Sequence, residues 1–115
     1  MRYRFGDFEL DTDCYELRLM DREITLPRRP FDLLVCLVRY RQRVVLKDEI
    51  IAAVWTDCCV CDATLTHCVM QVRRALGDDV AAPRFIRTLR RRGYRFVAAV
   101  EELPPASAHA SEQAR

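Results

Sequence analysis

One stretch of the chain, from Asp62 to Gly77, combines two different helix faces. Apolar residues recur along it at the spacing of a buried stripe: Leu65, Val69, Val72 and Leu76. The opposite face carries small, polar and partly cationic side chains without a carboxylate: Ala63, Thr66, His67, Met70, Gln71 and Arg74. Asp62 suits the N-cap and Gly77 the C′ position, so both ends are marked. Such a helix fits the major groove of DNA.

The first part of the chain alternates apolar and polar residues, which is the period of a half-buried strand. The alternation occurs in residues 3–5, 8–11, 15–19 and 24–26. Turn-forming residues such as Gly6 separate these runs. We expect a small antiparallel sheet with one polar face.

Two further helices are predicted before the one that starts at Asp62. Residues 31–40 are apolar on most sides, so this helix should be central and buried, with Pro30 near its first turn. Residues 47–55 form the other, and the acidic residues of its first turn complement the helix dipole.

The last patterned segment is a hairpin rich in arginine. Residues 85–89 and 94–98 have the pattern of strands, and we expect Gly93 to supply the positive φ of the turn between them. Every charged residue from Arg84 to Arg95 is an arginine, whereas the first part of the chain is rich in acids. One end of the molecule should therefore be basic, as a polyanion partner requires. The alternative is an arginine face that only meets solvent.

The composition indicates one soluble globular domain: the chain has 115 residues, 50% of them hydrophobic, and a net charge of +2. We assign residues 1–100 to this domain and residues 101–115, which lack apolar periodicity, to a flexible tail. No apolar run reaches the roughly 20 residues of a membrane span, and no signal peptide is visible. We expect a cytoplasmic protein that is nucleoid-associated when bound. No catalytic set of side chains stands out, so we expect no enzyme.

The order of the predicted elements is sheet, helix, helix, loop, helix, hairpin, which is the winged helix-turn-helix plan. The fold class is therefore α+β, a winged helix-turn-helix with an N-terminal antiparallel sheet, three helices and a C-terminal β-hairpin wing. The sequence also resembles the OmpR/PhoB-type winged-helix DNA-binding domain over residues 3–100. Two segments that carry this resemblance are Val72-Arg-Arg-Ala-Leu-Gly-Asp-Asp and Ile86-Arg-Thr-Leu-Arg-Arg-Arg-Gly-Tyr-Arg-Phe. The wing is most similar to the ToxR/CadC-like branch, and we expect no receiver domain before the winged helix.

The resemblance implies roles for individual residues. The helix from Asp62 to Leu76 would be the recognition helix. Residues near base edges would be Thr66, Met70 and Gln71, and residues near the DNA backbone would be Thr64, Arg73 and Arg74. Arg95 would enter the minor groove. His67 on the outward face and Arg91 and Arg92 in the wing complete the predicted DNA-binding set. The resemblance further implies tandem or dimeric binding to double-stranded DNA, and contact with RNA polymerase through the loop of residues 56–61.

The largest departure from the family is a cluster of thiols around the start of this helix: Cys58, Cys59, Cys61 and Cys68. Cys58 and Cys61 have the spacing of a soft-metal or redox pair. Three interpretations stay open. The thiols bind a soft metal or metalloid ion or form a reversible disulfide, they only pack, or they make intermolecular contacts. The sequence fixes no sign for the pKa shift of Cys61, because the helix start lowers it and Asp62 raises it.

The main hypothesis is a sequence-specific transcription regulator that binds double-stranded DNA, with the thiol cluster as a possible sensor of redox state or soft metal. One alternative is a thiol-disulfide or metal-handling protein that works through Cys58 and Cys61. Against it, no thioredoxin-like βαβ pattern surrounds these residues. The other alternative is an interaction module that keeps the fold but does not bind DNA.

Overall fold

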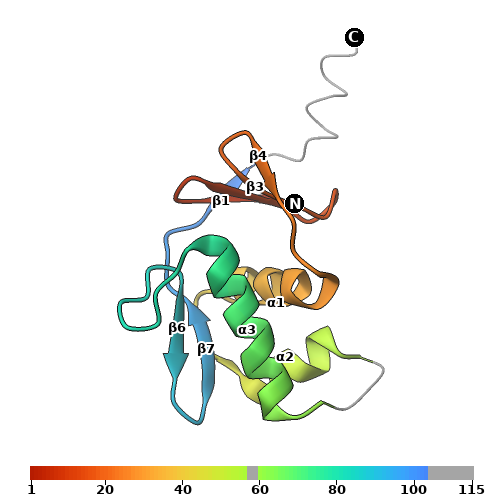
Figure 1. The fold of residues 1–115 in the computed structure, drawn as a ribbon, viewed down its shortest axis with the longest axis vertical. Coiled ribbons are helices and arrows are strands. Elements are labelled where there is room, and N and C mark those ends of the chain that lie inside the picture. Colours follow the sequence, from red (N-terminus) through yellow and green to blue (C-terminus); the bar gives the residue numbers. More distant parts are fainter. Residues whose placement is uncertain (57–59, 104–115) are drawn as a thin grey trace. The chain divides into compact units, whose positions relative to one another are not determined.

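The computed structural model describes residues 1–56 and 60–103 (Figure 1). The chain forms two compact units. The first unit consists of Met1–Thr25 and the segment that starts at Ala99, and the second unit is Leu26–Ala98. Each unit contains one sheet.

The first unit is built on a five-stranded antiparallel sheet with the strand order β4-β3-β2-β1-β8. Its N-terminal strands are β1 Arg2–Phe5, β2 Phe8–Asp11, β3 Glu16–Leu19 and β4 Arg22–Ile24. Tyr3 lies opposite Leu10, and Leu10 lies opposite Leu17, so the alternating apolar residues share one face of the sheet. All three side chains are buried, which confirms the predicted sheet.

The fifth strand of this sheet, β8 Glu101–Leu103, lies in the segment that the sequence assigns to a flexible tail. It pairs antiparallel with β1, with Arg2 opposite Leu103 and Arg4 opposite Glu101. The backbone hydrogen bonds of this pairing order a segment whose apolar pattern is too short to detect. The predicted boundary after residue 100 is therefore corrected, since the ordered fold reaches Leu103.

The second unit contains the three predicted helices, α1 Arg28–Arg39, α2 Lys47–Val54 and α3 Asp62–Leu76. α1 contacts both other helices, and its buried residues are Pro30, Phe31, Leu33, Leu34, Cys36, Leu37 and Val38. This confirms that it is the central helix. Pro30 lies in its first turn, where the missing N–H leaves no hydrogen bond unmade. None of the helices in the described part of the chain is long and apolar enough to cross a membrane.

The start of α2 is stabilised without a polar cap residue. Leu46 stands at its N-cap and has no side-chain oxygen. Glu49 accepts a hydrogen bond from the Leu46 N–H at 2.9 Å and pairs with the Arg43 guanidinium at 2.8 Å. Two contacts lower the pKa of the Glu49 carboxyl: the larger effect comes from the Arg43 guanidinium and the smaller one from the Leu46 N–H. One acidic residue in the first turn therefore joins the loop after α1 to the start of α2.

The sheet of the second unit has the order β5-β7-β6, with bounds β5 Val45–Leu46, β6 Ile86–Leu89 and β7 Gly93–Phe96. β6 and β7 form the predicted hairpin, which lies beside α3 (Figure 1). The sequence indicates no strand at Val45 and Leu46. In the structure these two residues pair with Tyr94 and Gly93, so the hairpin is attached directly to the segment that leads into α2.

The turn of the hairpin differs from the prediction in one respect. The residue with positive φ is Arg91, at 66°, and not Gly93. Gly93 is required for a different reason, because a Cβ atom there would lie 2.0 Å from the carbonyl oxygen of Val45. The glycine therefore permits the close approach of β7 to β5, while an arginine takes the left-handed position of the turn.

Candidate nucleic-acid interface

Both ends of α3 are fixed by backbone geometry. Asp62 is the first helical residue and Cys61 is the N-cap, which corrects the prediction that Asp62 is the cap. At the other end Gly77 adopts a left-handed conformation with φ 68°, as predicted. The N–H of Asp78 donates to the Arg73 carbonyl at 2.9 Å, which closes the last turn. The helix therefore spans the predicted residues with a different cap.

The outward face of α3 carries most of the predicted DNA-contacting residues. Its exposed side chains include Thr64, Thr66, His67, Met70 and Arg74. Gln71 is half-buried and lines a small cavity together with Pro30 and Trp55. The opposite face is buried through Leu65, Cys68, Val69, Val72 and Leu76. The two predicted faces of the helix are thus confirmed, and beyond the first turn the exposed face has no carboxylate.

Arg73 does not lie on that exposed face, which corrects the prediction that it is near the DNA backbone. Its exposed fraction is 8%. Its Nη2 donates to the Ile86 carbonyl at 2.9 Å and to the Thr88 hydroxyl at 2.7 Å. Its Nε is buried without a hydrogen-bond partner. Arg73 therefore joins α3 to β6.

Asp78 makes a second connection between α3 and the hairpin, and the sequence gives no sign of it beyond its place after Gly77. The Asp78 carboxylate accepts hydrogen bonds from the backbone N–H groups of Arg84 at 2.7 Å, Phe85 at 3.3 Å and Ile86 at 2.9 Å. These bonds fold the connector back onto the start of β6. Together with Arg73 they fix the hairpin relative to α3.

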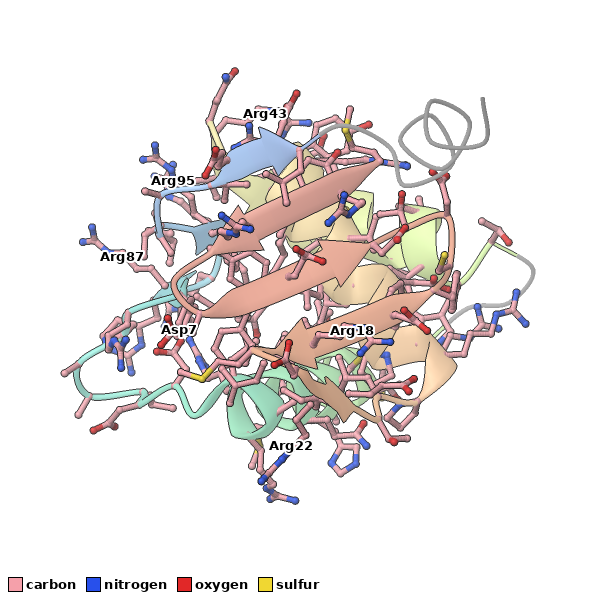
Figure 2. All side chains as sticks on the ribbon, turned by 90° about the horizontal axis from the view of Figure 1, so that it is seen from above. Asp7, Arg18, Arg22, Arg43, Arg87 and Arg95 are labelled. Atoms are coloured by element: carbon pink, nitrogen blue, oxygen red, sulfur yellow. The ribbon has the colours of Figure 1, made fainter. Side chains whose placement is uncertain are left out.

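The hairpin presents arginines that are not neutralised by neighbouring acids. Arg87 and Arg95 lie directly opposite each other on β6 and β7, and both are exposed (Figure 2). Like charges in this position repel each other. Arg95 donates through Nε to the Arg41 carbonyl at 3.2 Å. Within residues 1–56 and 60–103, no carboxylate is within ion-pair distance of five exposed arginines: Arg74, Arg87, Arg91, Arg92 and Arg95. Such a surface favours an external anion.

The described cysteines differ sharply in environment. Cys61 is exposed, and the Thr64 hydroxyl, 3.6 Å from its Sγ, lowers the pKa of its thiol together with the N–H groups of Thr64 and Ala63. Cys68 is buried, and burial raises the pKa of its thiol to about 12. The helix rise between the two positions is about 10 Å, too far for one metal ion to bind both.

Of the predicted thiol ligands, the two that the structure describes, Cys61 and Cys68, are therefore not brought together. Cys58 and Cys59 lie outside the described residues. Among the residues that the structure does describe, no group of three metal-ligating side chains is present. Cys68 fits the interpretation of a packed thiol, which the sequence left open.

The fold and the exposed arginines define a winged-helix domain of the kind found in transcriptional regulators. A family model described as "Transcriptional regulatory protein, C terminal" matches residues 21–96. The chain belongs to this family.

Known relatives and solved structures agree with this assignment. The chain is 34% identical over 95 residues to "Transcriptional regulator HilA" of Salmonella typhi, and 30% identical over 98 residues to "Transcriptional activator CadC" of Escherichia coli K12. These matches cover 83% and 84% of this chain but 17% and 19% of those proteins, so it spans less than a fifth of their length. The solved DNA-binding domain of E. coli CadC has a TM-score of 0.77 at 27% identity, over 89% of this chain and 96% of that domain. The predicted fold class and the ToxR/CadC-like branch are confirmed.

Proposed function

We propose that this chain is a sequence-specific binding domain for double-stranded DNA in a transcriptional regulator. The observation that supports this most directly is the pairing of two surfaces in the second unit. One is the exposed face of α3, polar and free of carboxylates beyond its first turn. The other is the adjacent hairpin, whose exposed arginines have no carboxylate partners among the described residues. A binding role, and not a catalytic one, accords with membership of this family.

α3 is proposed to enter the major groove with its exposed face. Thr66, Met70 and Gln71 would approach base edges, where Met70 can contact a thymine methyl group and Gln71 can pair with adenine. Thr64, His67 and Arg74 would contact the flanking backbone. Because Arg73 binds β6, it is not part of this contact set.

The hairpin is proposed to follow the adjacent minor groove. Arg95 would insert there, and Arg91 and Arg92 in the turn would contact phosphates. The repulsion between Arg87 and Arg95 would be relieved when DNA supplies the missing anions. Because few side chains of α3 can contact base edges, much of the affinity would come from the hairpin.

Regulation through thiols is a separate proposal, and it rests on Cys61. Cys61 is exposed and its pKa is lowered, which makes it the most reactive of the described thiols. It sits at the N-cap of α3, so its modification would act directly at the start of the DNA-contacting helix. Binding in tandem or as a dimer and contact with RNA polymerase through residues 56–61 remain predictions of the family resemblance. Location in the cytoplasm remains a prediction from the sequence pattern.

Selection of bound duplexes from random DNA tests the proposed function. We expect a defined preferred site for the wild-type chain. In salt titrations on that site, Arg95→Ala should weaken binding and reduce the slope of log K against log salt by about 0.9, because one cation that displaces counterions from the DNA is lost. Arg22→Ala, an exposed arginine on the sheet of the first unit, is the matched control and should leave the slope unchanged. Gln71→Ala should relax the preference at one base pair. A wild-type chain that enriches no sequence would refute the proposal.

A further inference from the structure

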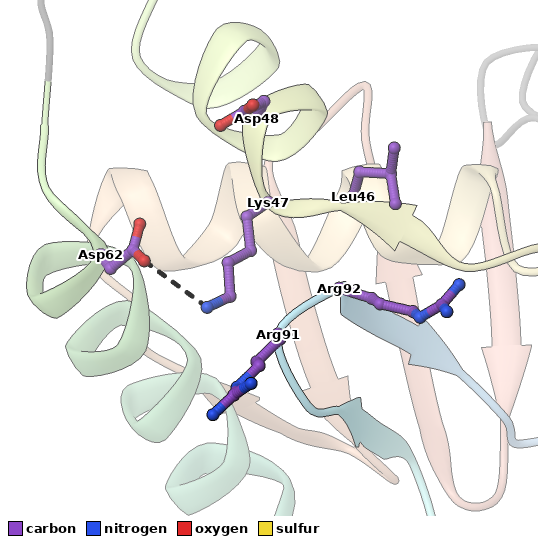
Figure 3. A pocket seen from close by; sticks show the side chains of 6 residues that line it. All are labelled: Leu46, Lys47, Asp48, Asp62, Arg91 and Arg92. Carbon is purple, nitrogen blue, oxygen red and sulfur yellow. Dashed lines mark ion pairs between the residues drawn. The ribbon is translucent and has the colours of Figure 1, made fainter.

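A cleft of about 500 Å³ lies between the start of α2, the start of α3 and the turn of the β6–β7 hairpin (Figure 3). Its lining residues are Leu46, Lys47, Asp48, Asp62, Arg91 and Arg92. Three of these side chains are cations from two separate segments, and two are carboxylates. Arg91 extends from the turn toward α3, on the same side as Lys47 (Figure 3).

One ion pair spans the cleft. The Lys47 Nζ lies 3.5 Å from the Asp62 Oδ2. The backbone of Lys47 is fixed, because its N–H donates to the Arg92 carbonyl at 3.1 Å. The carboxylate is mostly exposed, at 72%, and the lysine is partly shielded, at 32%. Exposed pairs of this kind contribute little to stability, so an external anion can replace Asp62 at Lys47.

The position of the cleft identifies which anion would replace it. In the proposed complex α3 occupies the major groove and the hairpin occupies the adjacent minor groove. A single strand of DNA backbone separates two adjacent grooves, and it must pass between the elements that occupy them. The cleft lies between these two elements, so the phosphates of that strand pass across it.

We propose that the cleft is a phosphate site whose lysine is held by Asp62 in the free protein. This inference rests on the proposed function, and it adds that Asp62 limits the affinity for DNA. The Asp62 carboxylate takes the place of a phosphate at Lys47, and it also repels phosphates that approach the start of α3. Asp62 thereby reduces the affinity for duplexes of any sequence, because phosphate contacts do not depend on sequence.

The test uses Asp62→Asn with Asp48→Asn as its matched control. Both variants remove one carboxylate from the first turn of a helix at the same cleft, but Asp48 pairs with no cation among the described residues. Fluorescence anisotropy measures the affinity for one duplex, a scrambled version of the preferred site, at roughly 50 to 300 mM salt. Phosphate contacts weaken over this range. We expect Asp62→Asn to tighten binding about three- to eightfold at 0.1 M salt relative to Asp48→Asn, with a slope steeper by about 0.9.

A double-mutant cycle shows whether the effect passes through the lysine. In a Lys47→Gln background, Asp62→Asn should have no larger effect than Asp48→Asn. Equal effects of the two substitutions in the wild-type background would contradict this inference alone, as would an effect of Asp62→Asn in the Lys47→Gln background that is larger than the effect of Asp48→Asn. A wild-type chain that binds no duplex at the lowest salt would contradict the proposed function, and this inference with it.

Discussion

Two adjacent arginines near the end of α3 should affect different properties of the protein when their charge is removed. Arg73 is buried and binds β6, whereas Arg74 is exposed and has no carboxylate partner in the described chain. Methionine keeps the length of the side chain and removes the guanidinium. We predict that Arg73→Met destabilises the fold, while Arg74→Met weakens DNA binding.

The expected size follows from the contacts of Arg73. Its two hydrogen bonds have a charged donor and contribute about 1.5–3 kcal/mol each. Removing the guanidinium also removes the cost of its buried, unpartnered Nε, about 1–3 kcal/mol. With the middle value of each range, the difference is a loss of roughly 2.5 kcal/mol in the free energy of unfolding. Arg74→Met should cost about 0.5 kcal/mol, as is usual for exposed positions.

Urea unfolding followed by circular dichroism measures the first effect. With m values of about 1–3 kcal/mol/M, Arg73→Met should lower the midpoint by roughly 1–2 M, and Arg74→Met by much less. Under conditions where both variants are folded, only Arg74→Met should reduce the salt dependence of DNA binding, by about 0.9 in slope. Equal shifts of the two midpoints would refute the assignment of Arg73 as the link between α3 and β6.

Two other predictions follow from the backbone and the thiols. Gly93→Ala should lower the free energy of unfolding by about 1–3 kcal/mol, because its Cβ would overlap the Val45 carbonyl. Gly77→Ala should lower it by about 1–2 kcal/mol, because its Cβ meets no atom but the residue must keep φ 68°. A Gly93→Ala variant that is as stable as the wild type in urea unfolding would contradict the close approach of β7 to β5. Cys61 should be alkylated by iodoacetamide faster than Cys14 at neutral pH, since the pKa of Cys61 is lowered and Asp11 raises that of Cys14, so the thiolate of Cys61 forms at lower pH; mass spectrometry that shows Cys14 reacting first would reverse this order.

Much of the fold was predictable because the relevant signals are local. The apolar stripe of α3, the alternation in β1 to β3 and the glycine after α3 each depend on neighbouring residues. β8 was missed because Glu101–Leu103 contains one apolar residue and is ordered by pairing with β1. β5 was missed because two residues are too few to show a period.

The candidate interface was predictable in composition and less so in detail. Thr66, Met70 and Arg74 were placed on the exposed face by helical periodicity alone. Arg73 differs from Arg74 by about 100° around the helix, and only the position of β6 shows that the difference buries it. The sequence predicts that Gly93 is required for its φ, whereas the contact with Val45 that actually requires a glycine cannot be read from local sequence.

The central claim is that the second unit recognises a particular DNA sequence and does not merely attract polyanions. The most direct test is the ratio of affinities for the selected duplex and for a scrambled duplex of the same composition, measured at one physiological salt concentration. We expect a ratio on the order of 10³ or more. A ratio near one, with both affinities falling equally as salt rises, would contradict it.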